Sequence, residues 1–221
     1  GETIEESAGL FNIGLEGILL LGALAGALGA QASGSAIIGL MTGITVGAAV
    51  GLIFGIISTT LRGSQLISGV GINLFALGFV ALMLTVMGAP GFHSVARDVQ
   101  VPLIHLGVGS LSPLVIVTVI LAVAVWWLLR RTQLGIWIRA VGENPAAADV
   151  AGLRVNALRL GAAIAAGAFA GLAGAYPSVD WFGAVTKEIT AGRGFFCVSF
   201  THLRAPEPVL RLDFRSSFVK K

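Results

Sequence analysis

A run without a single charged side chain, from Gly17 to Leu61, constrains this chain more than any other feature. A helix that crosses a bilayer needs about 20 apolar residues, so the run is long enough for two spans. Gln31 to Gly34 is the expected turn between them. The rest of the chain agrees: 56% of its residues are hydrophobic and 11% are charged, whereas charged residues make up about a quarter of a soluble domain. The sequence therefore predicts a membrane protein.

Uninterrupted apolar length predicts five full spans, at about residues 17–33, 35–58, 66–87, 113–129 and 160–176. We therefore expect an all-α fold, a polytopic transmembrane helix bundle of about five spans plus re-entrant segments. The fourth span ends in Trp126 and Trp127, followed by Arg130 and Arg131, a pattern typical of a membrane interface. Since the chain begins with Gly1 rather than Met, we expect it to be a fragment.

Positive charges on the connecting segments predict the orientation. Alternating spans place Arg62, Arg130, Arg131, Arg139, Arg154 and Arg159 on one side, and Arg97, Lys187 and Arg193 on the other. Basic residues concentrate on the cytoplasmic side, so the first side is predicted to be inside. The stretch Gly1 to Glu16 then starts inside, while residues 88–112 and the stretch after Tyr176 lie outside.

Small residues recur four apart in three of the predicted spans. The sets are Gly22 and Gly26; Gly47, Gly51 and Gly55; and Gly167 and Gly171. Helices in a bilayer associate by close packing, which such spacing permits. These glycines predict a compact bundle and no particular activity.

Polar side chains enter the predicted spans at a few places. In "GLFNIGLEGILLLGA", Asn12 and Glu16 would share one helical face, and in "GSQLISGVGINLFALG", Gln65 and Asn73 mix with glycines that allow a broken or re-entrant segment. A third place is "EITAGRGF" (188–195). Polar groups at this depth usually face a cavity or the bundle interior, so we predict that these four side chains line a pathway. The other interpretation of Glu16 is a carboxylate at the cytoplasmic interface.

The sequence offers no catalytic centre. His93 and His105 are expected to be loop residues without neighbouring metal ligands, Cys197 is the only cysteine, and no serine or cysteine nucleophile has a base nearby in sequence. No GxxxxGK[ST] phosphate loop is present, so any ATP must bind to another chain. We expect no metal, no cofactor and, despite a net charge of +3, no nucleic-acid partner.

One small polar helix is predicted between the fourth and fifth spans, in "RAVGENPAAADVAGLRV" (139–155). Asn144 suits an N-cap, Pro145 suits the first turn, and Gly152 suits the residue that ends a helix. The helix lies on the predicted cytoplasmic side. It is either an ordinary capped loop helix or a handle for a soluble partner.

Three motifs together resemble one family. "RAVGENPAAADVAGLRVN" resembles the cytoplasmic coupling segment of permease subunits from ATP-binding-cassette (ABC) importers, in the group of ribose, nucleoside and branched-chain amino-acid permeases. "GETIEESAGLFNIGLEGILLLGALAG" and "EITAGRGF" resemble two further signatures of the sugar and nucleoside branch, and "NIGLEG" favours nucleoside-type members. The resemblance covers about residues 1–195, with 139–155 as the coupling loop.

The resemblance implies a function and a set of partners. The chain would be a permease subunit, without enzymatic activity, that translocates nucleosides or simple sugars across the bacterial cytoplasmic (inner) membrane. Its partners would be an ABC ATPase subunit, a second permease subunit (identical or different), an extracytoplasmic substrate-binding protein and the lipid bilayer. The ATPase-coupling residues would be Glu143, Asn144, Pro145, Ala147, Ala148 and Gly152.

Two points stand apart from that resemblance. The tail 196–221 carries five basic residues in its last eighteen positions and no span-length apolar run, so we expect it not to be native family sequence. A different class of protein, an ion-coupled secondary carrier or a channel for a small polar solute, stays open. Such a protein would normally carry ionisable residues in mid-span, and the second to fifth predicted spans carry none.

Overall fold

The computed structural model describes residues 1–61, 63–88, 92–94, 104–106, 109–111, 113–181, 183–186 and 189–204. Within these ranges five helices are long and apolar enough to cross a membrane. They are α2 (Leu15–Ser33), α3 (Ala36–Gly55) with its π-helical extension η1 (Ile56–Thr60), α4 (Gln65–Val86), α5 (Pro113–Arg131), and α8 (Val155–Tyr176) with η3 (Pro177–Trp181). The predicted all-α polytopic bundle is confirmed. The chain turns between α2 and α3 at Gly34, whose φ is 67°.

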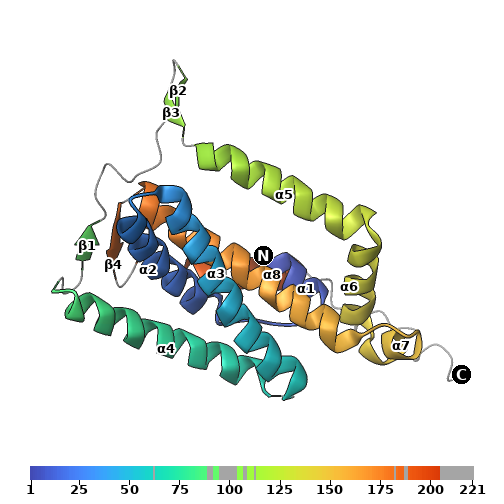
Figure 1. The fold of residues 1–221 in the computed structure, drawn as a ribbon. Helices are drawn as coiled ribbons and strands as arrows, with labels where there is room; N and C mark the ends of the chain where they lie inside the picture. The colour runs from blue at the N-terminus through green and yellow to red at the C-terminus, as the bar shows by residue number, and fades with distance from the viewer. Residues whose placement is uncertain are drawn as a thin grey trace, which may run out of the picture.

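The helices α2, α3 and α8 form the centre of the bundle, and α3 and α8 make the most extensive contact (Figure 1). Their glycines explain the close approach, because a Cβ on Gly47 would meet the backbone of Gly167 and Gly171. A Cβ on Gly22 would lie 2.6 Å from the carbonyl oxygen of Gly171. The predicted glycine faces are therefore packing faces.

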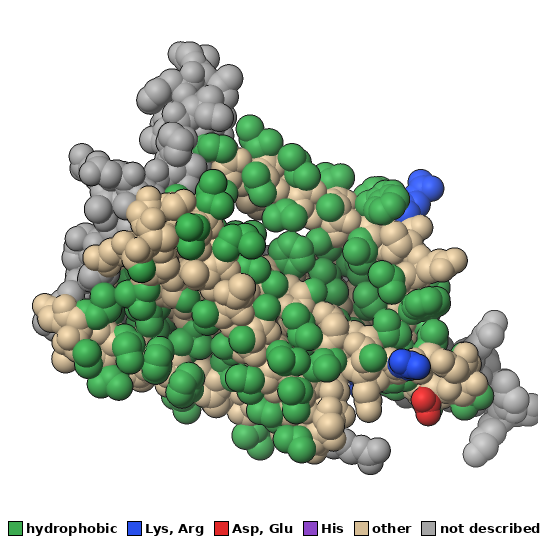
Figure 2. Space-filling model, in the orientation of Figure 1, with side chains coloured by type: hydrophobic (Ala, Val, Ile, Leu, Met, Phe, Trp, Pro, Cys, Tyr) green, Lys and Arg blue, Asp and Glu red, His purple; other side chains and the backbone are tan. Residues whose placement is uncertain are grey.

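The outer helices present apolar side chains to the surroundings. On α4, Leu74 and Phe75 are exposed, and α5 exposes Ile120 and Trp127 among many others. Figure 2 shows hydrophobic side chains over most of the visible face, with charged ones only at the end where α6 and α7 lie. Such a surface suits contact with lipid or with other apolar helices.

The two ends of the bundle differ. One end carries α6 (Gln133–Glu143) and α7 (Pro145–Val150), which join α5 to α8 (Figure 1). At the other end β1 (Phe92–Ser94) pairs antiparallel with β4 (Ala184–Thr186), and β2 (Ile104–Leu106) pairs antiparallel with β3 (Gly109–Leu111). The backbones of His93 and His105 belong to β1 and β2.

The orientation analysis predicted that the stretch after Tyr176 lies outside. The structure differs, because this stretch does not stay at the outer end of the bundle. After β4 the chain turns back into the bundle, and residues 190–194 contact the first turn of α2. The first turn of α2 lies at the opposite end of that helix from Gly34, where the outer connection between α2 and α3 lies. Arg193, at the start of α9 (Arg193–Arg204), therefore does not belong to the outer loop. The other two basic residues assigned to that side, Arg97 and Lys187, and Arg62 on the first side, lie outside the described residues.

The start of the chain also differs from its predicted cytoplasmic position. Helix α1 (Glu2–Ser7) lies beside α8, and a Cβ on Gly1 would lie 3.0 Å from Cβ of Phe169, well inside that span. Residues 8–14 then connect α1 to α2 without forming a helix. The glycines of α4 were expected to allow a broken segment, but α4 is one continuous helix. The non-helical segment lies in residues 8–14 instead.

Candidate functional site

The non-helical segment 8–14, here called the break, lies at the depth of the spans. The carbonyl of Ile13 bonds to Asn73, and Asn73 is eight residues, about 12 Å, along α4 from its first residue Gln65. In a bilayer, backbone N–H and C=O groups outside a helix need partners within the protein. The break is therefore stable only where nearby side chains supply them.

Helix α4 supplies two hydrogen bonds to the break and one to the first turn of α2. The Phe11 N–H donates to Oε1 of Gln65 at 2.8 Å, and the Gly17 N–H donates to Oδ1 of Asn73 at 2.7 Å. Asn73 Nδ2 donates to the carbonyl of Ile13 at 2.9 Å. Gly69 permits this approach, since a Cβ there would lie 2.8 Å from the backbone nitrogen of Gly14. Gly69 thus makes room for the break.

Asn12 holds the break from within. It is completely buried, and its Oδ1 accepts from the Gly14 N–H at 2.9 Å. Its Nδ2 lies 3.4 and 3.3 Å from the two carboxylate oxygens of Glu5, which is also completely buried. From α8, Arg159 Nε donates to the Ala8 carbonyl at 3.1 Å.

Glu16 follows the break, in the first turn of α2. Its Oε1 accepts from the Thr190 hydroxyl and, at 2.9 Å, from the Gly192 N–H, and its Oε2 accepts from the Gly194 N–H at 2.6 Å. The carboxylate therefore joins α2 to the turn that precedes α9.

The structure brings together the four side chains predicted to line a pathway. Asn12, Gln65 and Asn73 bond to backbone of the break or of the first turn of α2. Glu16 lies in that first turn and bonds instead to the backbone of residues 192 and 194. Sequence analysis missed Glu5, Arg159 and Thr190. Their partners lie 7, 151 and 174 residues away, and no local spacing in the chain indicates such pairs.

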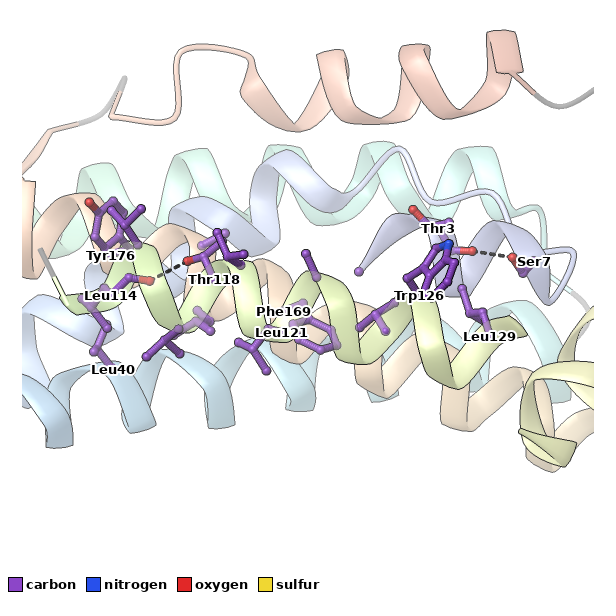
Figure 3. A pocket seen from close by; sticks show the side chains of 18 of the residues that line it. Thr3, Ser7, Leu40, Leu114, Thr118, Leu121, Trp126, Leu129, Phe169 and Tyr176 are labelled. Atoms are coloured by element: carbon purple, nitrogen blue, oxygen red, sulfur yellow. Dashed lines mark hydrogen bonds between the residues drawn. The ribbon is translucent and has the colours of Figure 1, made fainter. Parts of the chain in front are cut away.

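A mostly apolar cavity lies apart from the break. It has a volume of about 1070 Å³ between α5, α8 and α1, and Leu121, Trp126 and Phe169 are among the residues that line it (Figure 3). Two of its hydroxyl groups bond to their own helices, Ser7 to the Thr3 carbonyl and Thr118 to the Leu114 carbonyl. None of the four predicted pathway residues lines it.

At the α6–α7 end, the small helix forms as the sequence predicted. Asn144 Oδ1 accepts from the Ala147 N–H at 3.0 Å, which is the expected N-cap bond. Gly152 adopts a φ of 84° after the helix ends. Ala148 is 4% exposed and holds α7 on the bundle, whereas Ala147 is exposed and Val150 is 92% exposed. One face of α7 is thus anchored and the other is presented outward.

Helix α6, which the sequence analysis did not predict, connects α7 rigidly to α5. Thr132 both caps α6, accepting from the Gly135 N–H at 3.3 Å, and bonds back to the Leu128 carbonyl of α5 at 2.6 Å. At the other end of α6, directly after Glu143, the N–H of Asn144 donates to the Ala140 carbonyl at 3.1 Å. A single residue thus separates each pair of helices, Thr132 between α5 and α6 and Asn144 between α6 and α7.

A shallow groove of about 830 Å³ lies between α7 and the end of α3. Ser58 and Thr59 of η1 line one wall, and Pro145, Ala146 and Asp149 line the other. Arg154 and Arg159 also border the groove. Within the described ranges no group of three His, Cys, Asp or Glu side chains could hold a metal ion.

Comparison with known proteins gives matches to transport permeases. A family model described as "Branched-chain amino acid transport system / permease component" matches residues 1–197. A putative glucose ABC transporter permease protein of Haloferax volcanii is 34% identical over 208 residues, which cover 90% of this chain and 63% of that protein. No solved structure matches this chain.

Two further relatives carry nucleoside names. A nucleoside ABC transporter permease protein of Lactococcus lactis is 26% identical over 223 residues, covering 90% of this chain and 68% of that protein. A guanosine ABC transporter permease protein of Bacillus subtilis is 30% identical over 220 residues, with the same two coverages, 90% and 68%. The chain thus spans 63% to 68% of the length of these three relatives.

Proposed function

This chain belongs to the family described as branched-chain amino acid transport system permease components, and from that premise we propose that it is the membrane-spanning permease subunit of an ABC importer. It is a multi-pass membrane protein, and we assign it to the bacterial cytoplasmic membrane. ATP hydrolysis takes place on a separate ATPase subunit. A second permease subunit completes the pathway, and an extracytoplasmic binding protein delivers the cargo.

One structural observation carries the proposal: α7 is a rigidly capped helix with one anchored and one exposed face, located where α5 is joined to α8 (Figure 1). Glu143, Asn144, Pro145, Ala147, Ala148 and Gly152 form or flank it. An ATPase that binds the exposed face of α7 moves this helix as a rigid body. The single-residue connections at Thr132 and Asn144 transmit the displacement to α5. The groove beside η1 widens the surface available to this partner.

The cargo we propose is a nucleoside or a simple sugar. The names of the relatives in Haloferax, Lactococcus and Bacillus support this choice. The amides of Asn12, Gln65 and Asn73 are neutral hydrogen-bonding groups, which suit an uncharged solute. Asn12, Gln65 and Asn73 remain proposed pathway residues, in addition to the hydrogen bonds that they make to the backbone.

The permease domain is assigned to residues 1–195, with 139–155 as its coupling loop and 196–221 as sequence outside the family. The family match, which ends at residue 197, supports this division. A single DNA read through the codons on both sides of Phe195 tests it. An open frame that continues into apolar spans supports the division, while the same tail in independent isolates contradicts it.

The function is tested by expressing the gene that contains this chain with the ATPase and binding protein of its own genome, in a host without nucleoside uptake. Membranes are solubilised and the chain is captured by an affinity tag. The proposal predicts that the ATPase copurifies and that the cells accumulate tritiated guanosine or glucose. Capture of the chain without the ATPase contradicts the proposal.

A further inference from the structure

The carboxylate of Glu16 has an unusual partner set for a group in the first turn of a spanning helix. Its three donors, the Thr190 hydroxyl and the N–H groups of Gly192 and Gly194, all come from one short turn 174 to 178 residues later in the chain. Glu16 is half-buried, and a carboxylate withdrawn from water is costly unless such donors surround it. The contact is therefore a specific link between α2 and the turn before α9.

The backbone of that turn is shaped to receive an anion. Ala191 and Gly192 both have positive φ, 44° and 76°, and backbone N–H groups in a turn can form a concave site for an anion. Ala191 is the only residue other than glycine with positive φ within the described part of the chain. A strained conformation of this kind persists only where surrounding contacts hold it in place.

Close backbone approach gives a second, independent observation. A Cβ on Gly194 would lie 2.6 Å from the backbone nitrogen of Glu16, so α9 touches α2 at a point where only glycine fits. One turn further along α9, Val198 is buried in a cluster with Leu15 and Ile18 of α2. The apolar cluster supplies burial, and the carboxylate fixes the orientation of the turn.

We propose that Glu16 is a positioning residue, which holds the turn 189–194 and the start of α9 on the first turn of α2. The same turn of α2 is held from the other side by Asn73, through the Gly17 N–H. The start of α2 is thus fixed between α4 and α9. This role requires both carboxylate oxygens and the Thr190 hydroxyl, and it is independent of the transport function and its substrate.

The only cysteine of the chain offers a direct probe. Cys197 lies on α9, three residues after Gly194, and is exposed. A nitroxide label on Cys197 of the complete chain, in lipid vesicles, reports how tightly α9 is held through its electron paramagnetic resonance spectrum. No ATPase or cargo is needed, so this test can fail without affecting the proposed function.

Two substitutions remove the contact. Glu16→Gln replaces one acceptor oxygen with an NH₂ group that faces a backbone N–H, and Thr190→Val removes the hydroxyl while keeping the shape of the side chain. Each is expected to cause loss of the immobilised component of the spectrum. Thr190→Val serves as the independent variant if Glu16→Gln does not fold.

Two matched variants keep the contact. Thr190→Ser retains the hydroxyl, and Asp149→Asn makes an acid-to-amide change at an exposed position of α7; both are expected to leave the spectrum of the parent. An unchanged spectrum for Glu16→Gln overturns the proposal. So does a Thr190→Ser spectrum as mobile as that of Thr190→Val, because the hydroxyl would then not be the group that matters.

Discussion

Asn73 binds the backbone on both sides of the start of α2: its Oδ1 accepts from the Gly17 N–H at 2.7 Å, and its Nδ2 donates to the Ile13 carbonyl at 2.9 Å. One amide side chain thus satisfies a donor and an acceptor that would otherwise lack partners at the end of the break. Asn73 is itself buried, so the loss of its side chain leaves these backbone groups without partners inside the protein.

Asn73→Leu should therefore destabilise the bundle. It leaves two buried backbone groups unpaired, each at a cost of about 1–3 kcal/mol in the free energy of unfolding. Unfolding in mixed micelles measures this cost. Thr85→Val on the same helix is the control, because the Thr85 hydroxyl is exposed and bonds only to its own helix, at the Ala81 carbonyl. Equal stability of the two variants contradicts the assigned role.

If Asn73 also lines the pathway, uptake by Asn73→Leu falls. Uptake equal to that of the parent contradicts the pathway role.

Gly171→Ala should force α3 and α8 apart. The added methyl group meets the carbonyl of Gly43 and the backbone of Gly47, and overpacking of this kind costs about 1–3 kcal/mol. Gly161→Ala, on the same helix α8, is the matched control because nothing lies within 4 Å of its added Cβ. Micelle unfolding should show a loss of stability for the first variant alone. Equal losses would mean that helix packing is not the cause.

Ala147→Arg should abolish ATP-driven uptake while leaving the amount of protein in the membrane unchanged. Ala147 is exposed on α7, and surface substitutions change stability by only about 0.5 kcal/mol, so the loss reports an obstructed partner. Uptake and immunoblots of the membrane fraction are the two measurements. Gln133→Arg places the same charge on exposed α6 and should transport normally. Full uptake by Ala147→Arg would contradict the coupling role of α7.

Asn144→Ala should loosen α7 without unfolding the bundle. The N-cap bond to the Ala147 N–H is lost, at a cost of about 1 kcal/mol, so amide exchange in 145–151 should be roughly fivefold faster. Hydrogen exchange followed by mass spectrometry detects this change. Asn144→Ser keeps a capping oxygen and should exchange at the rate of the parent. If the two variants exchange alike, the cap does not stabilise α7.

The five spans and α7 were predictable because their signals are local. An uncharged run specifies a span by its length, and Asn144, Pro145 and Gly152 specify the start and end of a short helix by their own backbone preferences. The glycine pairs likewise predicted packing faces, as Gly22 and Gly171 show. Each of these signals lies within a few residues of the structure it specifies.

The break and its partners were not predictable in the same way. Residues 8–14 are mostly apolar and precede the first span without a turn signal. They are held open by hydrogen bonds to Gln65, Asn73 and Arg159, which lie far along the chain. Helix α6 was missed because Arg130 and Arg131 mark the end of a span without indicating that a second helix follows after Thr132. The turn 190–194 was placed outside because span alternation cannot detect a segment that turns back into the bundle.

The proposed function requires that this chain moves solute with energy from an ATPase that binds α7. The most direct measurement is uptake of tritiated guanosine or glucose into proteoliposomes that contain the purified complex, with its binding protein outside and nucleotide enclosed. We expect uptake with enclosed ATP, none with a non-hydrolysable analogue, and no effect of ionophores that collapse ion gradients. Uptake without ATP that stops when the ion gradient is collapsed would contradict the account and identify an ion-coupled carrier.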